Sequence, residues 1–260
     1  MTALRILVGI LLGAALAGGA FYFVLWNLDV DSDDALIVAI VAGAVGLAYS
    51  AVAFGLNVYK LGFWSVVGYV LDMTWSILNT LGGLLIWIPA CLIAGAKLLS
   101  RDSNTRRSGT FAYDKNPRDP SGAVYGATTI GTVIGGGWSS HEEIHVWQAR
   151  IFGPAYFVIY GLSFILNVLF RLLTFRTNDL SQEAYYRVCF EEWAYWGGST
   201  GGSDINWGGW VGGLMLASTY VTLVALIPIG LVTDTLGLWL IGSVGLALYN
   251  LVRALLPRGH

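Results

Sequence analysis

The sequence contains few of the charged residues that soluble proteins carry on their surfaces. Only 12% of its 260 residues are charged, and a soluble domain of this length carries roughly twice that fraction. Because 56% of the residues are hydrophobic, we expect most of the side-chain surface to face lipid or other membrane spans. The formal net charge is −2, so no general attraction to nucleic acid is expected. The composition therefore predicts an integral membrane protein.

Cysteine and histidine are also scarce. The two cysteines, Cys91 and Cys189, lie far apart in the sequence, which argues against a disulfide framework and a thiolate metal site. The chain has three histidines, too few for the histidine-rich di-iron centres of membrane desaturases and hydroxylases. A lipid oxidase of that kind is therefore excluded.

Long apolar runs predict an all-α, polytopic bundle of five or six membrane spans, forming a single domain over residues 1–260. The runs with the length of one span cover 3–28, 35–58, 155–173, 210–232 and 236–256. The apolar stretch over 62–99 is too long for one span. We expect an amphipathic or tilted helix to about residue 80 and a span over 81–99, or alternatively a tight hairpin of two spans.

Polar residues interrupt this pattern in a few places. Residues 100–122 are rich in Arg, Asp, Ser and Pro and are expected to form a polar loop. The positions of Lys and Arg fit no single six-span path, so an interfacial or re-entrant segment is expected around 62–80 or 123–152. Asp72 and Asn79 lie seven residues apart and are expected on one face of an interfacial helix. We expect a multi-pass protein of the cell membrane.

One stretch of the chain carries a pattern typical of metal chemistry. His141, Glu142 and His145 form H-E-x-x-H inside a helix expected over 140–152. Residues four apart share a helix face, so both imidazoles can reach one metal ion. Glu142 can then take a proton from metal-bound water. Zinc is the expected metal, because it lowers the pKa of such a water to about 7.

A structural explanation of the same residues is also available. Ser139-x-x-Glu142 and Ser140-x-x-Glu143 each fit a capping box, in which a serine and a glutamate satisfy the first backbone N–H groups of a helix. Capping by Glu143 is compatible with catalysis by Glu142. The pattern therefore favours a metal site over 135–198 without excluding a capping role.

A catalytic zinc ion needs a third protein ligand. His260 ends the chain and is not well placed, which leaves a carboxylate. Glu191 and Glu192 lie in a largely aromatic, apolar helix, where a carboxylate is costly unless it is paired or bound to a metal. Either residue can supply the ligand. The alternative is a helix facing water at the membrane interface, with Arg187 in an exposed ion pair.

H-E-x-x-H followed later by Glu191-x-x-Ala194 resembles the gluzincin zinc peptidases, especially their membrane-embedded members such as the prenyl-protein CAAX proteases and the bacterial heat-shock membrane proteases. Those families carry E-x-x-A-D in the later helix, so the resemblance implies Glu191, rather than Glu192, as the third ligand. Tyr195 stands where that pattern has Asp, so the carboxylate that orients a zinc-bound histidine is not evident. The stretch 135–198 also looks like a set of small prokaryotic membrane proteins that carry GH-x-x-Q-S, G-P-L-Y and E-x-W-A. The corresponding residues are His145-Val146-Trp147-Gln148-Ala149, Gly153-Pro154-Ala155-Tyr156 and Glu191-Glu192-Trp193-Ala194, with departures at Ile144 and Ala149.

The sequence thus favours a membrane-embedded, zinc-dependent hydrolase, most simply a peptidase acting on a membrane-associated peptide or protein. Glu142 is the expected general base, and His141, His145 and Glu191 are the expected zinc ligands. Tyr195 or Tyr185 is a candidate donor to the developing oxyanion. The alternative is a non-catalytic structural or accessory subunit of a larger membrane complex, with or without a bound metal.

Overall fold

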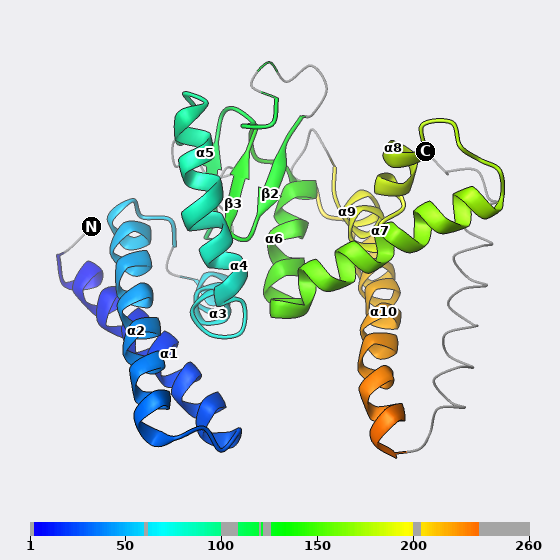
Figure 1. Cartoon of the computed structure of the whole chain (residues 1–260). Helices are drawn as coiled ribbons and strands as arrows, with labels where there is room; N and C mark the ends of the chain where they lie inside the picture. Colours follow the sequence, from blue (N-terminus) through cyan, green and yellow to red (C-terminus); the bar gives the residue numbers. More distant parts are fainter. Residues whose placement is uncertain are drawn as a thin grey trace. The chain divides into compact units, whose positions relative to one another are not determined.

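The structure is a computed structural model that describes residues 3–59, 62–99, 109–119, 121, 126–199 and 204–233. The chain divides into two compact units, Met1–Pro154 and Ala155–His260. Figure 1 shows the elements of each unit, which are described in turn.

The first unit begins with two long apolar helices, α1 (Ala3–Asn27) and α2 (Ser32–Gly55), packed side by side (Figure 1). Asp31 caps α2 by accepting a hydrogen bond from the backbone N–H of Asp33. A side chain at Gly46 would collide with the α1 backbone at Gly13. Glycine therefore allows the two helices to approach closely, as is usual for helices packed in membranes.

The apolar stretch after α2 folds as a bent pair of helical segments. It comprises α3 (Phe63–Met73), α4 (Ile77–Gly82), a π-helical turn η1 (Gly83–Trp87) and α5 (Ile88–Ile93). The axis bends by 86° between the segments 63–73 and 77–93. The expectation of one helix to about residue 80 is therefore wrong, and Asp72 and Asn79 lie on different helices. By length and composition, the pair is a broken span or a re-entrant loop.

The mostly helical fold that the sequence predicts is confirmed, but a small β-sheet, which the all-α expectation did not include, follows the bent pair. Strands β1 (Phe111–Tyr113), β2 (Thr128–Ile130) and β3 (Val133–Gly135) lie in the order β1-β3-β2. β1 is parallel to β3, and β2 is antiparallel to it. β1 lies inside the segment expected to be a polar loop and is fully buried. Strands of three residues are too short to show the alternation of polar and apolar residues that identifies a strand in a sequence.

The helix expected over 140–152 is confirmed as α6 (Ser140–Phe152). At its start, the Ser139 hydroxyl accepts a hydrogen bond from the backbone N–H of Glu142 at 3.3 Å. At the other end, side chains from the break in the bent pair and from α4 donate hydrogen bonds to backbone carbonyl groups. These donors are Trp75 Nε1 to Ile151 O, Ser76 Oγ to Ala149 O, and Asn79 Nδ2 to Ala149 O and Gly153 O. Side chains thereby satisfy backbone groups at both ends of α6.

A buried ion pair joins α6 to α3. Arg150 Nη2 lies 2.8 Å from Asp72 Oδ2, and both side chains are completely buried. The Tyr59 hydroxyl donates to the same carboxylate oxygen at 2.6 Å and lies 2.7 Å from the Tyr49 hydroxyl. Burial and the negative charge of Asp72 raise the pKa of Tyr59 well above its ordinary value. Asp72 is recognisable in the sequence as an acid in an apolar stretch, but its pairing with Arg150 is not.

The described part of the second unit contains the helices α7 (Tyr156–Leu173), α8 (Leu180–Tyr186), α9 (Cys189–Gly197) and α10 (Trp207–Thr233). A 3₁₀ turn, η2 (Gly153–Ala155), precedes α7. A side chain at Gly213 of α10 would collide with Trp193 of α9, so these two helices pack tightly. The span expected over 236–256 lies outside the described residues.

Among the described residues, three segments are long and apolar enough to cross a membrane: Ala3–Asn27, Ser32–Gly55 and Ser140–Leu173. A fourth is added if the bent pair counts as one span. Large apolar side chains on the outer faces of α1 and α2 are exposed, among them Leu7, Leu11, Ile37 and Ile40. This distribution is consistent with helices that contact lipid rather than water.

Candidate metal centre

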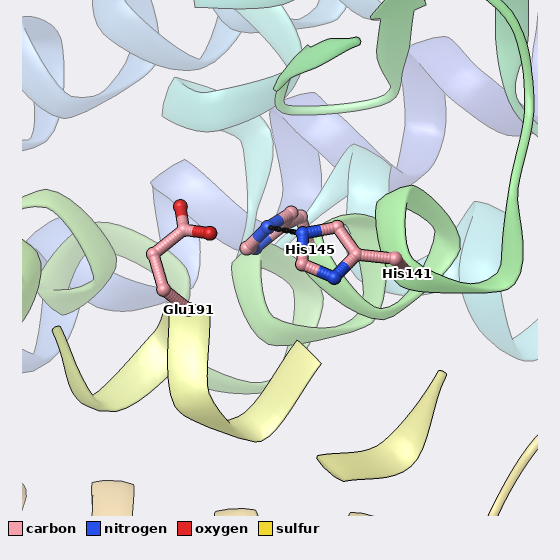
Figure 2. Close-up of side chains that lie close together, drawn as sticks. All are labelled: His141, His145 and Glu191. Carbon is pink, nitrogen blue, oxygen red and sulfur yellow. Dashed lines mark hydrogen bonds between the residues drawn. The ribbon is translucent and has the colours of Figure 1, made fainter. Parts of the chain in front are cut away.

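The two histidines of the motif face each other one turn apart on α6. His141 Nε2 lies 3.2 Å from His145 Nε2 (Figure 2), and both side chains are buried. Two nitrogen ligands at the usual zinc distance and a tetrahedral angle are about 3.3 Å apart. The separation of these two nitrogens therefore fits a pair of ligands on one metal ion.

Gln148 orients the second histidine. Its Oε1 lies 2.8 Å from His145 Nδ1 and is placed to accept a hydrogen bond from it. With the proton on Nδ1, the lone pair of His145 stays on Nε2, the atom that faces His141. Metal-binding histidines nearly always have such a partner on the other ring nitrogen. Gln148 thus takes the place of the missing carboxylate noted in the sequence.

The predicted general base is held by the sheet. Thr129 of β2 donates a hydrogen bond from its hydroxyl to Glu142 Oε2 at 2.5 Å. Ser139 does cap α6, as the capping pattern predicts, but the Glu142 carboxylate is bonded to Thr129. The contact orients the carboxylate of Glu142, a residue directly adjacent to His141.

The two glutamates of α9 have different partners. Glu191 is only 2% exposed, and the Tyr160 hydroxyl of α7 donates to its Oε1 at 3.0 Å. Arg187 Nη1 lies 3.9 Å from Glu192 Oε1. The ion pair offered as an alternative explanation of these acids therefore involves Glu192, and Glu191 is a buried carboxylate.

His141, His145 and Glu191 are all buried, and each offers one potential ligand atom within 4.8 Å of the other two. Figure 2 shows the Glu191 carboxylate turned towards the His145 ring. Two imidazoles and a carboxylate are a donor set that zinc accepts, and other divalent transition metals accept it too. The residues present therefore fit a bound metal ion.

Other predicted residues are less directly involved. Tyr195 is 42% exposed, and its ring packs against Tyr186. Tyr160 is a tyrosine that does contact an expected ligand, since its hydroxyl donates to Glu191. Sequence reasoning missed Gln148, Thr129 and Tyr160 in these roles. Of these, Gln148 was recognisable, because it lies one helical turn after His145.

Comparison of the chain with protein-family models, with curated proteins and with solved structures finds no match. The resemblance to gluzincin peptidases therefore rests on the motif residues alone.

Proposed function

We propose that this protein is a membrane-embedded, zinc-dependent hydrolase, and that it acts as a peptidase on membrane-associated peptides or proteins. The observation that carries the proposal is the grouping of His141, His145 and Glu191, whose potential ligand atoms lie within 4.8 Å of one another. A buried carboxylate beside two imidazoles is costly unless a cation compensates its charge.

In this proposal, His141, His145 and Glu191 hold the zinc ion. When bound, zinc supplies Lewis-acid polarisation of the substrate carbonyl and lowers the pKa of water. Glu142 accepts the proton of the attacking water, and the hydrogen bond from Thr129 fixes the direction of its carboxylate. Gln148 keeps the lone pair of His145 on Nε2.

We further propose that the chain crosses the cell membrane five or six times. The three candidate spans, α10 and the apolar run over 236–256 supply five crossings. The bent pair adds a sixth if it is a broken span, and none if it is a re-entrant segment. This arrangement is the source of the proposed substrate preference, because a site on a membrane-embedded helix meets substrates held in or at the bilayer.

The first test is the metal content of purified full-length protein, measured by mass spectrometry without chelators. Wild type is expected to carry about one zinc ion per chain, and His141→Ala/His145→Ala is expected to carry none. His260→Ala is the matched control, because it removes the third histidine and leaves the motif intact. A wild-type protein that holds no metal and takes none up from added zinc refutes the proposal.

The second test separates a hydrolase from a metal-bound structural subunit. Glu142→Gln removes the general base but none of the proposed ligands, so it is expected to keep its zinc and to lose hydrolysis of peptide substrates presented in detergent micelles. If zinc-loaded wild type and Glu142→Gln are equally inactive, and the zinc has four protein ligands by X-ray absorption, the structural subunit is favoured.

A further inference from the structure

Four side chains on one face of the largely apolar helix α7 make polar contacts with a single neighbouring segment. Their spacing of three or four residues places them on successive turns. Each one contacts the segment 183–191, which covers the end of α8 and the start of α9. The contacts join Arg171 to Glu183, Asn167 to Arg187, Ser163 to Cys189, and Tyr160 to Glu191.

Two of these contacts satisfy backbone groups at the break between α8 and α9. Asn167 Nδ2 donates to Arg187 O at 2.7 Å, and Ser163 Oγ accepts from the backbone N–H of Cys189 at 3.0 Å. Backbone groups at helix ends have no partner within their own helix and need one elsewhere when they are buried. These contacts therefore fix the position at which α9 begins, two residues before Glu191.

The contact between Tyr160 and Glu191 is of a different kind. The Tyr160 hydroxyl donates to Oε1 of a side chain rather than to the backbone, at 3.0 Å. Hydrogen bonds to an ionised carboxylate are stronger than those between neutral groups. Because Oε1 is engaged by the hydroxyl, the carboxylate is held in one orientation on a helix whose start is already fixed.

We infer that Tyr160 is a positioning residue that holds the Glu191 carboxylate in the orientation in which it would bind a metal. This inference rests on the proposed function, because it requires that Glu191 binds a metal. Partners of this kind around metal ligands commonly contribute ten- to hundredfold to metal affinity.

The test compares Tyr160→Phe with wild type in the full-length protein. Zinc affinity is measured by competition with a chromophoric chelator, and the absorption spectrum of the cobalt-loaded protein reports the coordination of the metal. The variant is expected to bind zinc about ten- to hundredfold more weakly, with an altered cobalt spectrum. Tyr22→Phe, on α1, is the matched control and is expected to change neither. Asn167→Ala is expected to lower the melting temperature.

The outcomes separate this inference from the proposed function. If wild type binds zinc and Tyr160→Phe binds it within twofold, with an unchanged cobalt spectrum, the role of Tyr160 is refuted and the metal site stands. If Tyr160→Phe loses affinity only in proportion to a lower melting temperature, as Asn167→Ala would, Tyr160 is structural and the inference is also refuted. A wild type that binds neither zinc nor cobalt overturns both.

Discussion

Breaking the buried ion pair between Asp72 and Arg150 should destabilise the protein strongly, whereas removing both partners should not. The Asp72 carboxylate accepts hydrogen bonds from Arg150 Nε and Nη2 at 2.8–3.2 Å and from the Tyr59 hydroxyl at 2.6 Å. Asp72→Leu leaves a completely buried guanidinium without its counter-ion, which typically costs about 3–5 kcal/mol of unfolding free energy. Arg150→Met leaves the carboxylate in the same situation, and a cost of similar size is expected.

The double variant Asp72→Leu/Arg150→Met exchanges the pair for apolar side chains, a change that is often neutral or stabilising. Here it also removes the acceptor of the Tyr59 hydroxyl, which costs about 1 kcal/mol, although Tyr59 keeps its contact with Tyr49. We therefore expect the double variant to be more stable than either single variant.

The measurement is equilibrium unfolding of the full-length protein in mixed micelles, followed by circular dichroism. Asp34→Asn is the control, because Asp34 is exposed in the first turn of α2, and it is expected to change the stability by less than about 0.5 kcal/mol. A double variant whose destabilisation equals the sum of the two single values would refute the argument, since the two charges would then not depend on each other.

Three further predictions follow from the site and the helix packing. Gln148→Leu removes the partner of His145 Nδ1 and should weaken zinc binding about ten- to hundredfold, measured by chelator competition; unchanged affinity would contradict the orienting role. Thr129→Val removes the hydrogen bond to the Glu142 carboxylate and should leave the zinc content unchanged. It should lower the hydrolysis rate about ten- to hundredfold, because a hydrogen bond to a charged group contributes about 1.5–3 kcal/mol. Thr129→Ser keeps the hydroxyl and should retain activity. Gly46→Leu should lower the melting temperature, because the side chain collides with the α1 backbone, whereas Gly19→Leu, at a position with open space, should not.

The parts of the structure that the sequence predicts are those where a local pattern is long or chemically specific. α6 is predicted with its bounds because a capping serine, a charged first turn and H-E-x-x-H coincide. The three strands are missed because each has three residues and β1 lies within a polar stretch. The bend at 74–76 is missed because no proline marks it. The hydrogen bonds that its side chains donate to α6 are also missed, because they join residues far apart in the sequence.

The residues of the candidate site also fall into those that the sequence indicates and those that it does not. His141, Glu142 and His145 are singled out by their spacing. The carboxylates in an apolar helix indicate Glu191 or Glu192, and the choice of Glu191 comes only from the resemblance to gluzincin peptidases. Tyr160 is not singled out, because it lies in a segment that hydropathy presents as a membrane span. The polar positions of α7 at 160, 163, 167 and 171 follow helical spacing, and this periodicity was the available signal of a face packed against protein.

The bend between α3 and α4 limits how this membrane segment can change during evolution. Replacing Trp75, Ser76 and Asn79 with leucine would make this apolar stretch more hydrophobic and therefore better suited to insert into a bilayer. It would also remove the donors to the last carbonyl groups of α6, which have no water to replace them in a lipid environment. Selection for a more hydrophobic segment at the bend and selection for an intact motif helix beside it therefore act in opposite directions.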